Sequence, residues 1–212
     1  MDNPSDLFRR LEQLNAIGAA LSKERDINRL LETILIAAKT ITHADGGTLY
    51  RMTEDGKALR FEILRTDSLD IAMGGTTGNV INFPNLPLSN DKGEANDSMV
   101  AAYAAIHDKT VNIADAYTEA GFDFSGTRSF DERTGYRSQS FLTVPMKNHE
   151  GEIIGVLQLI NAVDPRSKKV TPFSSADQSL AESLASQAAI ALTNRLLITQ
   201  LEELFEAFIN LI

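Results

Sequence analysis

Residues 129–146 bring together the side chains that could do chemistry. The segment reads SFDERTGYRSQSFLTVPM and sets two acids, two arginines and several hydroxyl groups beside an apolar run. Such residues suit acid–base catalysis, phosphate binding or the wall of a ligand pocket. Asp131 and Glu132 are adjacent, so their side chains point in different directions and are poorly placed to act as a catalytic pair. A solvated helix start is the favoured interpretation of these two acids.

Other catalytic patterns are missing from the sequence. His43, His107 and His149 are far apart and have no spacing typical of a metal site. There is no G-x-S-x-G elbow, no P-loop and no G-x-G-x-x-G fingerprint. The absence of cysteine excludes disulfides, zinc thiolates and a cysteine nucleophile. We therefore expect no catalytic residue, no metal and no cofactor in this chain.

Two hydroxyl groups of the same segment favour binding instead. Thr134 and Ser138 are four residues apart, and a short helix over residues 131–138 would put them on one face. Hydroxyls and the free N–H groups of a helix N-terminus are natural phosphate donors. We interpret this helix as a lid beside a cavity, with simple capping and solvation of a loop as the alternative.

Gln158 is a polar residue on an apolar strand face. With a period of two it shares this face with Ile154, Val156 and Ile160, and Thr143 on the preceding strand can face the same cavity. A buried amide left without partners costs about 1–3 kcal/mol. A ligand would satisfy both its donor and its acceptor. Neighbouring backbone, or a place at the sheet rim, would also do so, and the pattern leaves these possibilities open.

The elements that must position these residues follow an α+β order. Helices are expected over residues 7–21, 26–43, 98–107 and 174–198. Strands are expected over residues 48–52, 58–64, 110–113, 141–146 and 153–161. Residues 66–99 are rich in Gly, Asn and Pro and are expected to form a long loop. This order predicts an antiparallel sheet with helices largely on one face.

Both ends of the chain carry apolar residues at helical spacing. The first set follows a heptad pattern, which fits either packing on its own domain or a dimer seam: Leu7, Leu11, Leu14, Gly18 and Leu21. The last residues, 201–212, are apolar enough to contact a partner chain or a following domain.

Composition narrows the class of protein. The 212 residues suit one domain with helical extensions. A net charge of −9 disfavours a nucleic-acid binder, which needs a basic face to neutralise phosphates. The N-terminus is not a signal peptide, and the most apolar run, residues 153–163, is too short to span a bilayer. We expect a cytoplasmic protein that binds neither nucleic acid nor membrane.

Two blocks of sequence resemble a known family. VNIADAY (111–117) and FDERTGYRSQSFLTVPMKNHEGEIIGVLQLIN (130–161) are similar to GAF domains of cyclic-nucleotide phosphodiesterases and adenylyl cyclases, and the resemblance runs from about residue 30 to 193. It implies an α+β fold, with a six-stranded antiparallel sheet flanked by helices and long N- and C-terminal helices. It also implies a small-molecule pocket under a loop–helix lid, and frequent dimerisation through terminal helices.

A second resemblance concerns the longer protein. The segments RFEILRTDSLDIAMGG, INFPNLPL and LEELFEAFINLI look like bacterial signalling proteins in which a GAF domain precedes an HD-GYP phosphohydrolase domain. Such domains are metal-dependent and cleave cyclic di-GMP. This implies an N-terminal helix over 1–25, a GAF domain over 26–195 and a helical linker over 196–212. The catalytic domain would lie beyond Ile212.

Many cyclic-nucleotide GAF domains carry a signature of Asn-Lys, then Phe, three residues and Asp-Glu. Here Asn161, Phe173 and Asp177 match, whereas Ala162 and Gln178 replace the lysine and the glutamate. The Lys–Asp ion pair that the family implies therefore cannot form, which weakens cAMP or cGMP as the ligand.

The resemblance also assigns pocket positions. It places Asp131, Thr134 and Ser138 in the lid and Gln158 on the last strand, where relatives can carry an acid that reads the base. We expect a regulatory domain that senses a small molecule and forms a homodimer through its terminal helices. The alternative is a ligand-free dimerisation module. An enzyme like the GAF-type methionine sulfoxide reductases is rejected, because those enzymes need cysteines.

Overall fold

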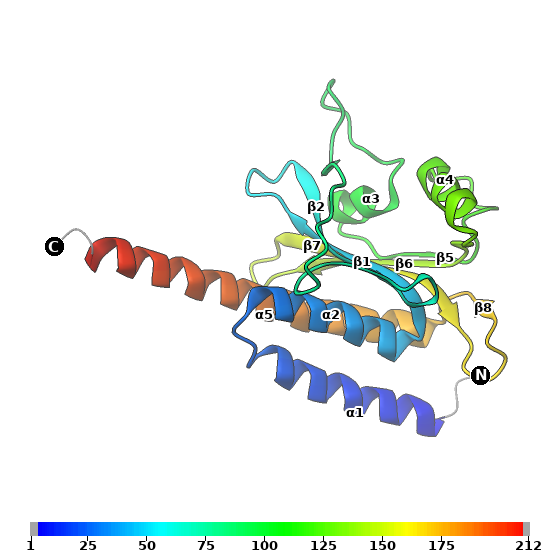
Figure 1. Ribbon diagram of the computed structural model, residues 1–212, viewed down its shortest axis with the longest axis horizontal. Helices are drawn as coiled ribbons and strands as arrows, with labels where there is room; N and C mark the ends of the chain where they lie inside the picture. The colour runs from blue at the N-terminus through cyan, green and yellow to red at the C-terminus, as the bar shows by residue number, and fades with distance from the viewer. Residues whose placement is uncertain (1–3, 210–212) are drawn as a thin grey trace.

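The computed structural model describes residues 4–209, and an antiparallel sheet forms its centre (Figure 1). The strands run in the order β3-β2-β1-β7-β6-β5, with β4 paired to β2 and β8 paired to β7. Their bounds are β1 Ala44–Met52, β2 Ala58–Thr66, β3 Ile71–Gly74, β4 Leu86–Pro87, β5 Val111–Ile113, β6 Phe141–Lys147, β7 Ile153–Val163 and β8 Val170–Thr171. The predicted α+β class and the six-stranded central path are confirmed.

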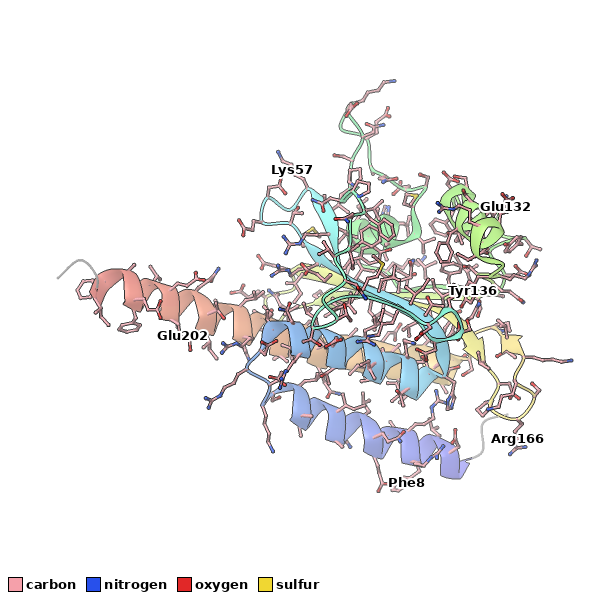
Figure 2. All side chains as sticks on the ribbon, in the orientation of Figure 1. Phe8, Lys57, Glu132, Tyr136, Arg166 and Glu202 are labelled. Carbon is pink, nitrogen blue, oxygen red and sulfur yellow. The ribbon has the colours of Figure 1, made fainter. Side chains whose placement is uncertain are left out.

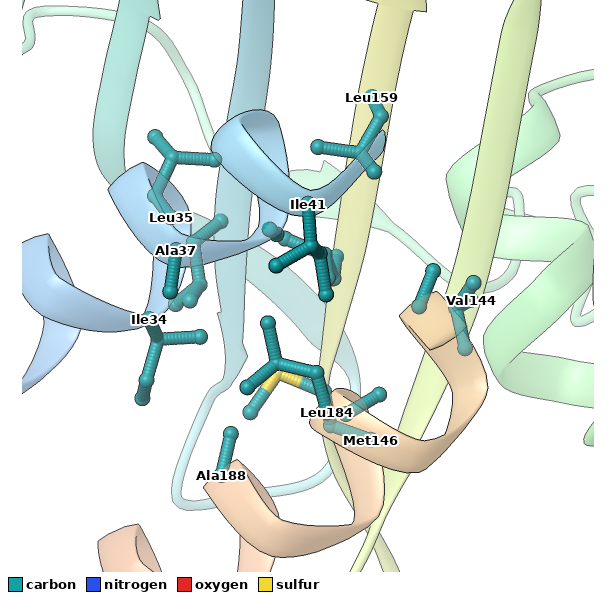
Figure 3. Packing of buried hydrophobic residues seen from close by; sticks show 14 of the residues in the cluster. Ile34, Leu35, Ala37, Ile41, Val144, Met146, Leu159, Leu184 and Ala188 are labelled. Carbon is teal, nitrogen blue, oxygen red and sulfur yellow. The ribbon is translucent and has the colours of Figure 1, made fainter. Parts of the chain in front are cut away.

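Two helices, α2 Ile27–Thr42 and α5 Ser175–Ile209, cover one face of this sheet, and α1 Pro4–Leu21 packs on their outer side (Figure 1). Figure 3 shows the core between them, where Ile34 and Ile41 of α2 meet Met146 of β6 and Leu184 of α5. Burial of these apolar side chains is the main force that holds the layer to the sheet.

Side chains cap the ends of two helices. The carboxylate of Asp26 accepts the backbone N–H of Arg29 at 2.8 Å, and His43 closes α2 in the left-handed region with φ 54°. Asp177 accepts both the backbone N–H and the hydroxyl of Ser174, and the Asp177 N–H is donated back to that hydroxyl. These contacts form a capping box in which Asp takes the place of the usual Glu.

The heptad residues of α1 pack largely on their own domain. Leu14 and Leu21 are buried in the main core, and Leu7 packs against it. Gly18 leaves room for the side chain of Gln187 on α5, whose Oε1 lies where a Cβ would stand. Leu11 is exposed, so the apolar set is divided between the core and the surface.

The opposite face of the sheet carries α3 (Val100–His107) and α4 (Ser125–Thr134) with their connecting segments (Figure 1). The short helix η1 (Asp67–Leu69) lies beside α2, where Asp67 pairs with Lys39. The prediction that residues 66–99 are loop throughout is wrong, because η1, β3 and β4 lie within it. β3 pairs with β2 over only four positions, and its last residue, Gly74, has φ 78°. Because β3 is short and ends in a glycine that is followed by another, its composition is that of a loop.

One predicted strand face needs correction. Val156, Gln158 and Ile160 share the face toward α3 and α4, as expected, whereas Ile154 packs against the helix-covered core. The β6–β7 pairing shifts register between Met146 and Lys147, so that Met146 faces Gly155 and Lys147 faces Ile153. An irregularity of one residue turns a side chain to the other face.

Candidate ligand-binding site

Four buried side chains form a polar floor at the centre of the sheet: Thr48, Tyr50, Thr143 and Gln158. Gln158 on β7 lies directly between Thr48 on β1 and Thr143 on β6. Its Nε2 donates to Thr143 Oγ1 at 3.1 Å, and the Tyr50 hydroxyl donates to its Oε1 at 3.4 Å. The amide is therefore satisfied by neighbouring side chains, and its central strand excludes the rim.

The floor keeps its tyrosine neutral. Burial raises the pKa of Tyr50 well above its usual range, and a hydrogen bond with Thr48 offsets only part of that shift. A neutral hydroxyl retains its proton and can donate it to Gln158. Sequence reasoning missed Tyr50 and Thr48, although the period of two along β1 places both on the face of Gln158.

Apolar clusters flank the polar floor on both sides. One contains Tyr50, Val156 and Ala101, and the other contains Phe141, Phe124 and Val100. Both draw residues from α3, which lies over β6 and β7. A flat ligand on this floor would meet polar groups at its centre and apolar walls at either end, an arrangement common in small-molecule sites.

The lid differs from the helix that the sequence predicts. α4 spans Ser125–Thr134 and ends at Gly135 with φ 71°, so a helix over 131–138 is wrong. Thr134 lies at the end of this helix, is exposed, and donates its hydroxyl to the carbonyl of Phe130 at 2.9 Å. Ser138 lies beyond the helix and is buried, so the two hydroxyls do not share a helical face.

Asp131 is the only residue of α4 that is buried, and it ties the lid to the chain around it. Its carboxylate accepts the backbone N–H of Ser138 at 2.7 Å, the hydroxyl of Ser138 at 2.8 Å and the hydroxyl of Tyr117 at 2.7 Å. This last hydrogen bond raises the pKa of Tyr117. Asp131 and Ser138 are thus brought together, and their polar groups bind each other.

Asn161, the first residue of the signature, holds the segment after the lid helix. Its backbone has φ 57°, a conformation that Asn adopts more readily than most residues. Its Oδ1 accepts the N–H groups of Gln139 at 2.7 Å and Ser140 at 3.2 Å, and its Nδ2 donates to the carbonyl of Arg137 at 2.8 Å. The side chain therefore fixes the segment that joins the lid to β6.

Tyr136 adds a contact that sequence reasoning missed. Figure 2 shows it at the end of the lid that also carries Glu132. Its hydroxyl donates to Asp45 Oδ2 at 2.6 Å, and Asp45 also accepts the N–H and hydroxyl of Ser68. Burial, followed by Asp45, raises the pKa of Tyr136. No local pattern predicts this pair, because its members are 91 positions apart.

The other signature residues lie on the helix side of the sheet. Phe173 is buried in the main core. Asp177 forms the capping box and an ion pair with Arg10 of α1, which supplies the cation that Ala162 cannot. The carboxylate is therefore paired despite the altered signature.

The structure adds two findings about the described part of the chain. Among residues 4–209, no three His, Asp or Glu side chains gather as metal ligands. Over the same residues, no helix is both long and apolar enough to cross a membrane.

Comparison with known sequences places this fold in a family. The model of the GAF domain matches residues 26–192. The dual 3′,5′-cyclic-AMP and -GMP phosphodiesterase 11A of Takifugu rubripes is 29% identical over 82% of this chain, and a cGMP-specific 3′,5′-cyclic phosphodiesterase of Drosophila sechellia is 30% identical over 66%. The chain spans only 17% and 11% of these two relatives.

Solved structures share the fold at lower identity. The GAF domain of an Acinetobacter phosphoenolpyruvate-protein phosphotransferase superposes with a TM-score of 0.63 at 16% identity, covering 94% of this chain and 99% of that one. Free methionine-R-sulfoxide reductase of Neisseria meningitidis gives 0.61 at 15% identity, covering 91% and 93%. On the strength of the family match, the chain belongs to the GAF family of regulatory domains and is related over this region to cyclic-nucleotide phosphodiesterases.

Proposed function

We propose that this GAF domain senses a small molecule held between the polar floor and the lid. The observation that carries the proposal is Gln158, a buried amide on the sheet face that α3 covers, whose present partners are the side chains of Thr143 and Tyr50. Both partners belong to the floor, so a ligand edge can replace them without unfolding backbone. Because the floor is buried, binding requires the lid or its neighbours to move.

The ligand class we propose is a cyclic nucleotide. An amide offers one donor group and one acceptor, which suits the edge of a base. Two relatives are named as phosphodiesterases of cyclic AMP and cyclic GMP. Ala162 in place of the signature lysine weakens the case for a cyclic nucleotide. The pairing of Asp177 with Arg10 restores part of that case, because the carboxylate still has a cation as its partner.

Calorimetry with cyclic AMP, cyclic GMP and cyclic di-GMP tests this proposal. We expect binding of at least one nucleotide, weakened in Thr143→Val and altered in base preference in Gln158→Glu. Thr118→Val is the matched control, since Thr118 is exposed on a loop away from the floor. Absence of heat and of any thermal shift across the three nucleotides would contradict the proposal.

We further propose that the parent is a cytoplasmic bacterial phosphohydrolase of the HD-GYP type. The support is the resemblance of segments such as INFPNLPL to those proteins, and the small share of its relatives that this chain spans. The expected result is metal-dependent hydrolysis of cyclic di-GMP by the full-length protein, with a rate that changes in the Gln158→Glu variant. Full-length protein without this hydrolysis would exclude the assignment.

A second function, self-association, is favoured by the distal part of α5. Apolar side chains there are exposed, with Leu201 55% and Phe208 64% accessible. We define the α5 seam as residues spaced alternately by four and three positions: Ile190, Asn194, Leu197, Leu201, Leu204 and Phe208. This is the a/d spacing of a coiled coil. Leu211 and Ile212, predicted to extend the segment, lie outside the described residues.

The charges around the α5 seam favour a second copy of this chain as the partner. Glu202, Glu203 and Glu206 fall at heptad positions b, c and f, away from the seam. The flanking e and g positions between residues 191 and 207 carry no charge. A homodimer therefore brings no like charges together, although the net charge of the chain is −9.

Asn194 favours a parallel arrangement of the two copies. It occupies an a position, where a polar residue specifies register, and in a parallel pair it faces its own copy. It also lines a cavity of about 670 Å³ where α5 passes the linker between α1 and α2. The seam thus begins beside the domain and continues along the distal part of the helix (Figure 1).

Cross-linking tests the pairing cleanly because the chain has no cysteine. We expect Leu204→Cys to form a disulfide-linked dimer on mild oxidation, whereas Glu203→Cys, on the opposite side of the helix, stays unlinked. Removal of residues 197–212 should give a monomer in sedimentation. A dimer that survives this truncation, or an antiparallel pair that leaves Leu204→Cys unlinked, would overturn the arrangement.

A further inference from the structure

One arginine of α1 joins the ends of α2 and α5, the two helices on which α1 packs. Arg10 is 3% exposed, and its Nε donates to the carbonyl of Ile41 in the last turn of α2 at 2.7 Å. The same guanidinium pairs with Asp177 in the first turn of α5. A cation at a helix C-terminus and a carboxylate at a helix N-terminus are each the favourable charge for that end.

The same end of α2 is also held from the lid side. α2 passes through His43 directly into β1, and Asp45, four positions after Ile41, receives the hydroxyl of Tyr136. The carbonyl of His43 accepts the N–H of Val163, which fixes this short stretch to β7. One turn of chain therefore carries a lid contact on one side and the Arg10 contact on the other.

We propose that the position of the lid and the docking of α1 are coupled through Tyr136–Asp45 and Arg10–Ile41. When the lid moves, the hydrogen bond between Tyr136 and Asp45 shifts or breaks, and the end of α2 moves. The carbonyl of Ile41, which accepts from Arg10, moves with it. The proposal rests on the sensing function for its biological meaning, but the coupling itself requires no ligand.

The physical case for two discrete states lies in the burial of Arg10. A buried cation that loses one partner is unfavourable, so α1 is either docked with both contacts or undocked. The rest of α1 is held by few buried side chains, chiefly Leu14 and Leu21, while Phe8 and Leu11 face solvent. α1 also lies outside the region that matches the family model, as an addition to the domain.

Hydrogen exchange on the whole chain without ligand tests the coupling in one direction. We expect Tyr136→Phe to speed exchange by about 2- to 30-fold both in the lid, residues 125–140, and in α1. Tyr117→Phe is the matched control: it removes a lid contact to Asp131 that does not touch α2, so only the lid should respond. Asp45→Asn replaces Tyr136→Phe should that variant not fold.

The same measurement also tests the coupling in the opposite direction, because coupling between two sites acts equally in both directions. Arg10→Met should speed exchange in α1 and in residues 135–140, whereas Arg9→Met, whose side chain is exposed beside Asp6, should leave the lid unchanged. Arg10→Lys provides the same comparison should Arg10→Met fail to fold. The proposal would be overturned if Tyr136→Phe left exchange in α1 unchanged and Arg10→Met left exchange in the lid unchanged.

Discussion

Two helical segments of this chain carry apolar residues at heptad spacing, and they meet opposite environments. In α1 the spacing places Leu14, 5% exposed, and Leu21 in the main core. In the distal part of α5 the same spacing leaves Leu201 and Phe208 in solvent. The patterns are nearly alike in sequence, so spacing alone does not decide which surface covers a seam.

The difference comes from groups that lie between the apolar positions. In α1, Gly18 leaves room for Gln187, and Arg10 finds a carbonyl and a carboxylate on the two neighbouring helices. The distal α5 offers no comparable polar match within the described residues, because the helix there has passed the end of the sheet (Figure 1). A heptad pattern predicts burial, and the polar residues within it indicate the partner.

The largest effect should follow from breaking the polar match of α1. Arg10→Met leaves the carboxylate of Asp177 without its cation, and we expect the free energy of unfolding to fall by about 3–5 kcal/mol. Arg9→Met, one position along on the exposed side, should change it by no more than about 0.5 kcal/mol. Urea unfolding followed by circular dichroism measures both. Equal losses in the two variants would mean that α1 is not held by Arg10.

A pair of leucine substitutions compares the two seams directly. Leu14→Ala opens a cavity in the core and should cost about 2–5 kcal/mol of unfolding free energy. Leu201→Ala should leave the unfolding of dilute protein unchanged within about 0.5 kcal/mol, yet weaken self-association. Chemical unfolding and sedimentation at several concentrations separate the two results. A stability loss in Leu201→Ala at low concentration would mean that its own domain covers the seam.

The smallest effect should appear at alkaline pH, and it depends on tyrosines that lie outside both heptad segments. Tyr50 and Tyr136 have pKa values raised in the folded state, so their stabilising contribution is complete below pH about 10 and is lost as the pH rises toward their folded pKa. Absorbance at 295 nm should show these two of the four tyrosines titrating last, with loss of structure. Tyr50→Phe should lessen the alkaline loss. Titration of all four near pH 10 would contradict the burial.

Local patterns predicted those features that depend on near neighbours in the chain. The order of helices and strands, and the face that Val156, Gln158 and Ile160 share, follow from residues a few positions apart. A spacing of four residues predicts one helical face for Thr134 and Ser138, whereas Gly135 ends the helix between them. The period of two places Ile154 on the wrong face, because a register shift between two strands leaves no sign in the sequence of one strand.

The candidate site was predictable only in part. Gln158, Thr143, Asp131 and Ser138 do gather on the lid face of the sheet or in the lid itself, as the sequence and the resemblance suggest. Their contacts with a ligand stay a prediction, as does that of the exposed Thr134. The pairs Tyr136–Asp45 and Arg10–Asp177 join residues 91 and 167 positions apart, and such contacts depend on the assembled fold.

α5 is a single unbroken rod of 35 residues, about 50 Å long, from the capping box to Ile209. Each residue along such a rod is rotated by about 100° around the helix axis relative to the residue before it. A domain joined after Ile209 therefore takes its facing direction from the register of the helix. Fusions of a reporter domain to this GAF domain should work in steps of seven added residues, which keep the seam in phase, and fail when two are added, which turn the reporter by about 200°.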